Sequence, residues 1–269
     1  MSNPTPPVVL SIAGSDSSAG AGIQADLKTI TALGAYAATV VTAVTAQNTQ
    51  GVRGVHTVPP SMIAQQICAV MDDLEPTAIK IGMLTDAATV EAVASSLSLY
   101  PRRPVVYDPV MLSTSGHRLM SDEATRMVVA QLIPLCTLVT PNLPEASFFL
   151  SREITTPVDM EQAAADLWQR WGTSVVVKGG HLMGAEPCDV LCHAGHITRH
   201  TTPAVLSRNT HGTGCTFSSA IATRLAQGYP MEKAVAQAKQ YIYQAIAQGK
   251  DLNIGHGHGP LCHFVRNEE

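Results

Sequence analysis

Residues 209–216, Asn-Thr-His-Gly-Thr-Gly-Cys-Thr, place two glycines and a thiol directly before a helical pattern. The first backbone N–H groups of a helix have no intrahelical partner, and together with the helix dipole they attract anions. Gly212 and Gly214 would let the backbone approach a phosphate closely, and the stretch 215–227 is predicted to be a helix closed by Gly228. The segment therefore indicates a phosphate site, and the plain alternative is a glycine turn that only enters a helix.

A second glycine-rich loop covers residues 14–22 and contains the pattern Gly20-x-Gly22-x-x-Ala25. This pattern nearly matches a dinucleotide-binding fingerprint, which also needs an acidic residue about 20 positions later to bind the ribose. No acidic residue occurs between Asp26 and Asp72, which argues against a nicotinamide or flavin site. The sequence also lacks Gly-x-x-x-x-Gly-Lys-Ser/Thr, so the ordinary P-loop route to ATP is excluded.

The elements that must position these loops alternate along the chain between short apolar strands and helical patterns. This alternation predicts an α/β fold with a central, mostly parallel sheet covered by helices on both faces, and ligands at the carboxyl ends of the strands. We expect residues 1–269 to form a single domain. The predicted strands are 8–13, 36–46, 78–82, 104–108, 137–140 and 174–179, and the predicted helices are 23–33, 61–74, 86–97, 121–133, 142–150, 159–171 and 215–227.

Composition narrows the class of partner. Of 269 residues, 14% are charged and 45% are hydrophobic, the formal net charge is -4, and no basic stripe occurs, so we expect small-molecule partners and no nucleic acid. The N-terminal residues carry no basic side chain, and the apolar run 8–13 is too short for a signal or membrane-spanning helix, which favours a cytoplasmic protein without a membrane partner. The six cysteines show no regular framework and are expected to be reduced thiols.

Two groups of histidines and cysteines raise the alternative of a zinc site. The first is Cys188-x-x-x-Cys192-His193-x-x-His196, and the second is the tail His256-Gly-His258-Gly-Pro-Leu-Cys262-His263. Zinc modules usually pair two close ligands with a second close pair after a longer gap, and the first group alternates along what look like hairpin strands. The spacing therefore argues against structural zinc.

Several segments of the chain follow one another in a characteristic order: AGSDSSAGAGIQADLKTITALGAYA, TAVTAQNTQGV, KIGML, VVYDPVM, TPNLPEA, VVVKGGH, NTHGTGCTFSSAIA and GHGP. Together they resemble the hydroxymethylpyrimidine/phosphomethylpyrimidine kinases of thiamine biosynthesis, within the ribokinase-like superfamily. The resemblance covers nearly the whole chain, and it implies a ribokinase-like fold. It also implies transfer of the γ-phosphoryl group of ATP, with Mg²⁺, to 4-amino-5-hydroxymethyl-2-methylpyrimidine and then to its monophosphate.

The resemblance gives the glycine turn a catalytic role. The backbone amides of Gly212, Thr213, Gly214 and Cys215 would hold the migrating phosphoryl group, as phosphoryl transfer requires. Sugar kinases of the superfamily carry an aspartate base at the end of this turn, where this chain has Cys215. We therefore expect Cys215 to be the general base, with a pKa that the helix N-terminus lowers, and the alternative is a small buried thiol.

The resemblance also assigns the acceptor pocket to the first-strand loop and the loops that face it. Gln47 is the most informative member, because its amide offers a donor and an acceptor that match the ring nitrogen and amine of an aminopyrimidine. Its alternative is a glutamine that caps its own turn, and Asp26 has the alternative of a carboxylate in the first turn of a helix. The residues assigned to the pyrimidine site are Gly14, Gly22, Asp26, Val44, Gln47, Met83 and Val110.

On the nucleotide side, Asp108, Asn142 and Lys178 lie at or just after predicted strand ends, where an open parallel sheet places ligand groups. Asn142-x-x-Glu145 resembles the Asn-x-x-Glu motif of the superfamily, whose glutamate organises Mg²⁺, commonly through water. Without the resemblance, Glu145 is an acid in the first turn of a helix and Lys178 is a lysine at a strand end.

Three functions remain open from the sequence. They are the pyrimidine kinase, a pyridoxal or pyridoxine kinase of the same superfamily, and a pyrimidine-binding protein that has lost turnover. The intact GTGC turn argues against the third. Relatives in the superfamily make a homodimer an expectation, and the small residues in loops 109–116 and 179–186 make these loops the expected lids.

Overall fold

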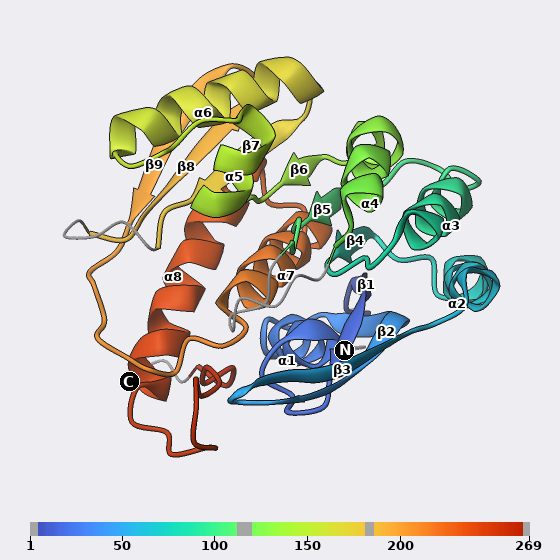
Figure 1. The fold of residues 1–269 in the computed structure, drawn as a ribbon, viewed down its shortest axis with the longest axis horizontal. Coiled ribbons are helices and arrows are strands. Elements are labelled where there is room, and N and C mark those ends of the chain that lie inside the picture. The colour runs from blue at the N-terminus through green and yellow to red at the C-terminus, as the bar shows by residue number, and fades with distance from the viewer. Residues whose placement is uncertain (1–4, 112–119, 181–185, 266–269) are drawn as a thin grey trace.

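The computed structural model describes residues 5–111, 120–180 and 186–265, and within these ranges the chain forms a nine-stranded sheet between layers of helices (Figure 1). The strand order is β3-β2-β1-β4-β5-β6-β7-β8-β9. Strands β1, β2, β4, β5, β6 and β7 run parallel, whereas β3 and β8 pair antiparallel with their neighbours. The predicted α/β class with a mostly parallel sheet is confirmed.

The strands are β1 Val8–Asp16, β2 Tyr36–Asn48, β3 Gly51–Thr57, β4 Ala78–Ile81, β5 Val105–Tyr107, β6 Leu138–Val139, β7 Ser174–Lys178, β8 Cys188–His193 and β9 His196–Thr201. The helices are α1 Gly22–Ala32, α2 Pro60–Asp73, α3 Ala87–Leu97, α4 Asp122–Met127, α5 Leu143–Leu150, α6 Pro157–Trp171, α7 Thr213–Ala226 and α8 Met231–Gly249, with a π-turn at Val128–Leu132 and a 3₁₀ turn at Ile133–Leu135 after α4. Each predicted strand and helix overlaps one of these elements.

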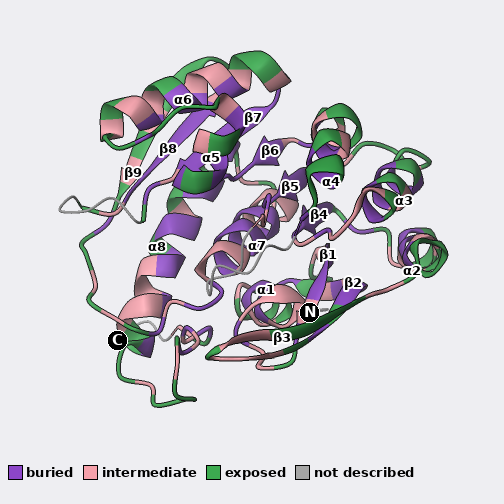
Figure 2. Ribbon diagram, viewed as in Figure 1, coloured by how far each residue is buried: buried purple, intermediate pink, exposed green. Residues whose placement is uncertain are grey.

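Alternation along the buried strands divides the core between the two faces of the sheet, because successive strand side chains point to opposite sides. In β1, Leu10 and Ile12 pack with α2, α3 and α4, whereas Val9 packs with α1, α7 and α8. In β7, Val175 and Val177 pack with α5 and α6, and Val176 packs with α7 and α8. Figure 2 shows these strands as the buried centre of the molecule.

Two elements, β3 and α8, were not predicted from the sequence, and β8 and β9 were indicated there only as the hairpin-like strands of the Cys188–His196 group. Strand β3 is short and largely exposed, and its residues GVRGVHT have no apolar alternation, so only its antiparallel pairing with β2 makes it a strand. Helix α8 follows Pro230 and buries residues at helical spacing, among them Ala234, Val235 and Ala238. None of the helices within the described ranges combines the length and the apolar character needed to span a bilayer.

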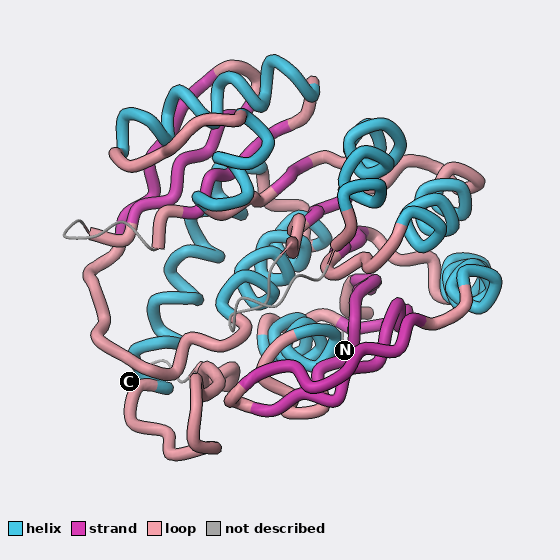
Figure 3. The backbone as a smooth tube through the Cα atoms, viewed as in Figure 1, coloured by secondary structure: helices cyan, strands magenta, loops and turns pink. Residues whose placement is uncertain are grey.

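The parallel strands bring their carboxyl ends to one edge of the sheet, as their common direction requires. The N-terminus of α7 and the tail 255–260 reach the same edge. In the tail, the His258 N–H donates to the carbonyl of Thr49 in the β2–β3 turn (2.9 Å), and the His211 N–H donates to the Gly259 carbonyl (3.1 Å). Figure 3 shows this tail as a loop beside the end of the β2–β3 hairpin.

Candidate active site

The glycine turn begins α7 in the manner that its sequence predicts. Gly212 is the N-cap residue with a φ of 85°, in the left-handed region that favours glycine, and a Cβ there would overlap the Gly20 carbonyl. The first intrahelical bond runs from the Thr216 N–H to the Gly212 carbonyl (2.9 Å). The N–H groups of Gly214 and Cys215 precede that bond and belong to the helix end that attracts anions.

Gly214 lies against an ion pair from the ends of β5 and β7, the two strands that flank β6. Asp108 follows β5, Lys178 ends β7, and Lys178 Nζ lies 2.5 Å from Asp108 Oδ1. A Cβ at Gly214 would lie 3.1 Å from Asp108 Oδ2 and 3.3 Å from Lys178 Nζ, so a larger residue would press on both groups. Burial alone would lower the pKa of Lys178, but the charge of Asp108 raises it above its ordinary value. The lysine therefore places a fixed positive charge beside the glycine turn.

Asn142 and Glu145 form a capping box at the start of α5. The Asn142 side chain accepts from the Glu145 N–H (2.9 Å), and Glu145 Oε2 accepts from the Asn142 N–H (2.8 Å). The carboxylate is also buried beside the Asp108–Lys178 pair, and burial raises the pKa of Glu145 to about 7, partly opposed by Lys178. Glu145 is thus a helix-capping acid and also a carboxylate that gains from an added positive charge.

Cys215 is half-buried in the first turn of α7, and its pKa departs from the expectation. Burial raises the pKa of this thiol to about 11, although Lys80 and the Gly22 N–H both act to lower it. The prediction that the helix N-terminus lowers this pKa is wrong, because the loss of solvent around the thiol outweighs the effect of the helix end.

A buried ion pair lies behind Cys215. Ser11 and Lys80 project from β1 and β4 towards α1 and α7, where both oxygens of Asp26 lie 2.8 Å from Lys80 Nζ. Asp26 also accepts from Ser11 Oγ (2.6 Å) and Ser219 Oγ (2.7 Å). The Asp26 and Lys80 side chains are 0% exposed, so the Asp26 carboxylate is fully engaged by the protein and does not itself face a ligand. Burial alone would lower the pKa of Lys80, but the charge of Asp26 raises it.

The residues assigned to the acceptor pocket come together along β1, β2 and β4. A Cβ at Gly14 would collide with the Met83 side chain, and one at Gly22 would collide with the Gly14 carbonyl. Val44 is exposed and Gln47 is half-buried, both in β2, while the Val110 N–H donates to the Asp108 carbonyl (2.8 Å). Val110 therefore lies beside Asp108, and Asp26 lies buried behind the pocket. The other assigned residues lie on the β1–β2 side of the same edge.

Sequence reasoning did not select Asp16 or His211, which join the two glycine loops. Asp16 ends β1, His211 precedes the glycine turn, and His211 Nε2 lies 2.8 Å from Asp16 Oδ2. The side-chain amide of Gln47 approaches the same ring nitrogen to 3.3 Å. Lys80 was also not selected, and its signal was a lysine between two isoleucines in the predicted strand 78–82.

The residues of the zinc alternative take ordinary structural positions. His193 Nδ1 lies 2.7 Å from Ser174 Oγ, and His263 Nε2 lies 3.1 Å from Thr216 Oγ1, while Cys188 and Cys192 pack in the core beside α6. Among the residues that the structure describes, no three His, Cys, Asp or Glu side chains are placed to hold a metal ion. All six cysteines are free thiols. Of the two expected lids, residues 112–116 and 181–185 lie outside the described ranges.

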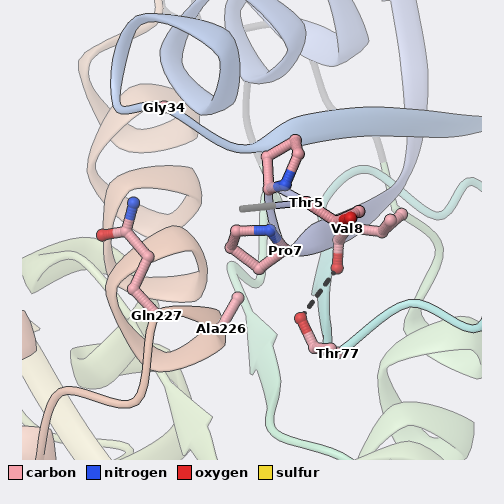
Figure 4. Close-up of a pocket in the computed structure, with 8 residues that line it drawn as sticks. Thr5, Pro7, Val8, Gly34, Thr77, Ala226 and Gln227 are labelled. Atoms are coloured by element: carbon pink, nitrogen blue, oxygen red, sulfur yellow. Dashed lines mark hydrogen bonds between the residues drawn. The ribbon is translucent and has the colours of Figure 1, made fainter. Parts of the chain in front are cut away.

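A separate cavity opens at the opposite edge of the sheet (Figure 4). It is lined by residues from the start of β1, the residue before β4 and the end of α7, among them Val8, Thr77 and Ala226. Thr77 Oγ1 donates to the Val8 carbonyl across it (3.1 Å). None of the described residues that line this cavity has a titratable side chain, and the cavity lies away from the carboxyl ends of the strands, so we do not assign the chemistry to it.

Comparison with known proteins supports one family. The family model described as phosphomethylpyrimidine kinase matches residues 16–262. The chain is 45% identical over 260 residues to a hydroxymethylpyrimidine/phosphomethylpyrimidine kinase of Rhizobium meliloti, covering 96% of this chain and 97% of that protein. It is 48% identical over 261 residues to the thiamine biosynthesis bifunctional protein ThiED of Geobacter sulfurreducens, covering 97% of this chain but only 53% of that protein, so it spans about half of this relative.

Among solved structures, an ADP complex of Bacillus subtilis pyridoxal kinase has a TM-score of 0.88 and 33% identity, covering 97% of this chain and 98% of that one. The fold is therefore the ribokinase-like fold expected from the sequence. With a family model that matches from Asp16 to Cys262, and with relatives matched over nearly the full length, this chain belongs to the phosphomethylpyrimidine kinase family.

Proposed function

We propose that this chain transfers the γ-phosphoryl group of ATP to 4-amino-5-hydroxymethyl-2-methylpyrimidine and then to its monophosphate. The observation that carries the proposal is the position of the glycine turn. Gly214 contacts the Asp108–Lys178 pair on one side. On the other side, Gly212 contacts Gly20 in the glycine-rich loop 14–22, which borders the acceptor pocket. Donor and acceptor groups would therefore meet at the first turn of α7.

On the donor side, the amides of Gly212, Thr213, Gly214 and Cys215 would receive the transferring phosphoryl group. Phosphoryl transfer needs positioning and charge stabilisation more than covalent chemistry, and the N-terminus of α7 supplies both. Lys178 would add a positive charge that Asp108 holds in place, because their ion pair fixes the ammonium beside Gly214. The amide oxygen of Asn142 already caps α5 and orients Glu145. Its NH₂ group would be the part that contacts the nucleotide.

The residues beside the turn also fit Mg²⁺. Glu145 is a buried carboxylate with a pKa raised to about 7, which an added cation would relieve, and its second oxygen has only a long contact to the Met111 N–H (3.5 Å). Glu145, together with Asp108, would hold the ion largely through water, as Mg²⁺ prefers. The ion would neutralise charge on the phosphate oxygens.

On the acceptor side, Gln47 would read the aminopyrimidine edge, and Gly14, Val44 and Met83 would line its ring. The backbone of Gly22 would close the loop against Gly14, and Val110 would complete the pocket from the nucleotide side. Asp26 would act from behind, by holding Lys80 near Cys215. The thiolate form of Cys215 would accept the proton of the acceptor hydroxyl late in a loose transition state, when that oxygen has become acidic, and would become the thiol.

A pyridoxal kinase activity is the second candidate, because a pyridoxal kinase shares this fold at 33% identity over nearly the whole chain. Both acceptors are small heteroaromatic rings with a hydroxymethyl group. They would use the same phosphate machinery, so the difference between the two functions rests on the pocket around Gln47 and Met83.

Mass spectrometry of the products made from Mg-ATP and the hydroxymethylpyrimidine, its monophosphate or pyridoxal tests the proposal. Mono- and diphosphorylated pyrimidine is the expected result, and pyridoxal phosphate alone would contradict it. The Cys215→Ala variant should lose most turnover. Cys68→Ala is the matched control, since it removes a half-buried thiol from α2, on the other face of the sheet. Binding of the pyrimidine without product would favour a non-catalytic binding protein.

A further inference from the structure

Asp16 is held as an ionised acceptor at the end of β1. Its Oδ1 accepts from the N–H and the hydroxyl of Ser18 (2.8 Å each), and its Oδ2 accepts from the N–H groups of Gly20 (3.1 Å) and Ala21 (2.9 Å). Burial alone would raise the pKa of Asp16, but hydrogen bonds from His211, Ser18 and Ala21 lower it to about 2. Backbone N–H groups only donate, so both carboxylate oxygens are acceptors.

The charge on Asp16 fixes a proton on His211. The ring nitrogen Nε2 lies 2.8 Å from Asp16 Oδ2, and because that oxygen only accepts, Nε2 must carry the proton and donate it. The nearest side-chain amide atom of Gln47 lies 3.3 Å from the same Nε2. That single N–H already donates to Asp16, so at 3.3 Å the Gln47 atom meets only the longer branch of a shared hydrogen bond. An amide oxygen is attracted to the N–H at this distance and an NH₂ group is repelled by it, which favours the oxygen on this side. The oxygen and nitrogen of an amide are assigned from such hydrogen bonds.

The other end of the Gln47 amide leads to the same orientation. Thr45 Oγ1 lies 2.9 Å from the Ser15 carbonyl and 3.3 Å from the second amide atom of Gln47. A carbonyl only accepts, so the single hydroxyl proton of Thr45 goes to Ser15 and leaves the Thr45 lone pairs to accept. An NH₂ group of Gln47 at this position supplies the matching donor. Both neighbours of the amide therefore favour the same orientation.

We propose that His211, held by Asp16, is a positioning residue that turns the Gln47 amide oxygen towards the imidazole and its NH₂ group towards Thr45. The inference rests on the proposed function, since it gives a physical cause for the choice of acceptor. After these contacts the Gln47 amide keeps one N–H and one oxygen lone pair for a ligand. Such a pair fits a ring in which an acceptor nitrogen adjoins an amino group.

The same histidine joins acceptor recognition to the phosphate turn. His211 directly precedes Gly212, the N-cap of α7, and its ring packs on Gly20, where a Cβ would collide with it. His211 is only 6% exposed, so its orientation is fixed by the protein rather than by solvent. Replacement of His211 should therefore weaken acceptor binding in the pocket first, through the changed orientation of Gln47.

A double-mutant cycle between His211 and Gln47 tests the proposal. The assay measures kcat/KM for the pyrimidine at saturating Mg-ATP, with the KM for ATP as an internal control. We expect His211→Leu to lower kcat/KM for the pyrimidine about tenfold, equivalent to about 1.4 kcal/mol, with the KM for ATP nearly unchanged. In a Gln47→Ala background the same change should have less than about a twofold effect, because its target is gone. Equal losses in both backgrounds would overturn the proposal.

Two further variants keep the test decisive. His211→Gln keeps an N–H donor and should retain most of the wild-type kcat/KM. It replaces His211→Leu as the test variant if the leucine variant does not fold. A tenfold loss of kcat/KM in His211→Gln would count against the proposal. Gln47→Glu keeps an oxygen for His211 but has no NH₂ group, and it should fold normally while losing acceptor affinity. His196→Leu is the matched control, because that histidine is exposed at the β8–β9 turn.

The outcome also separates this inference from the proposed function. Absence of pyrimidine phosphorylation by the wild-type protein would refute the proposed function. Wild-type phosphorylation together with additive losses in the cycle would refute only the role of His211.

Discussion

The raised pKa of Cys215 makes a quantitative prediction for the pH dependence of turnover. Burial raises the pKa of this thiol to about 11. At a pH of about 7.5 only roughly one thiol in three thousand is then ionised, compared with about one in ten for a free thiol of pKa 8.5. If the thiolate is the base, kcat/KM should rise about tenfold for each pH unit between about 7 and 9, without a plateau.

The matched perturbation replaces the thiol by a carboxylate at the same position. In Cys215→Asp the base should be ionised over the whole range, so the steep rise should disappear and kcat/KM should become nearly independent of pH. Cys68→Ala should keep the wild-type slope. Both profiles are measured with low concentrations of Mg-ATP and pyrimidine, so that they report the free enzyme.

A direct titration provides the check on this reasoning. The ultraviolet absorbance of the thiolate, taken as the difference between wild type and Cys215→Ala across the pH range, gives the pKa of Cys215 itself. A wild-type kcat/KM that stays constant between about pH 7 and 9 would refute thiolate base catalysis. A titration midpoint near neutral pH would refute the assignment of burial as the dominant effect.

Three other predictions concern single contacts at the same edge of the sheet. Lys80→Met leaves Asp26 as an uncompensated buried charge and should lower the free energy of unfolding, measured in urea, by about 3–5 kcal/mol. The double variant Lys80→Met/Asp26→Asn should recover part of this loss. A loss below about 1 kcal/mol in Lys80→Met would contradict the burial argument. Because the pKa of Glu145 is raised to about 7, the Mg²⁺ concentration that the wild type requires should fall as the pH rises through that value. Glu145→Gln should need more Mg²⁺ and show no such pH dependence. Magnesium titrations that superimpose for the two proteins would exclude Glu145 from the magnesium site. Gln47→Ala should raise the KM for the pyrimidine and leave the KM for ATP unaltered, and an unaltered pyrimidine KM would remove Gln47 from the pocket.

The fold could be predicted from the sequence because its parallel strands are short, apolar and separated by helical patterns. The same topology predicts that residues following the parallel strands gather at one edge of the sheet. Asp108 and Lys178 do so, and they form an ion pair there. Strand β3 was missed because an exposed edge strand has no apolar alternation and depends on its pairing with β2. The periodicity of the sequence is a local signal, whereas this pairing is a tertiary one.

The electrostatics of the site could not be predicted in the same way. The sequence places Cys215 in the first turn of a helix, which is correct, but it does not show how much solvent the thiol loses there. Asp16 and His211 lie 195 positions apart and carry no paired signal. Lys80 did carry a signal in the sequence, because a lysine inside a short apolar strand requires a buried partner. In the structure that partner is Asp26.

We propose that the protein phosphorylates an aminopyrimidine at this edge of the sheet in preference to pyridoxal. This preference is tested most directly by kcat/KM for the hydroxymethylpyrimidine and for pyridoxal, measured with the same wild-type preparation and the same Mg-ATP concentration. We expect the pyrimidine value to be higher by at least about tenfold, since one well-placed hydrogen bond contributes about that much discrimination. A pyridoxal value equal to or higher than the pyrimidine value would contradict the proposed preference for the pyrimidine.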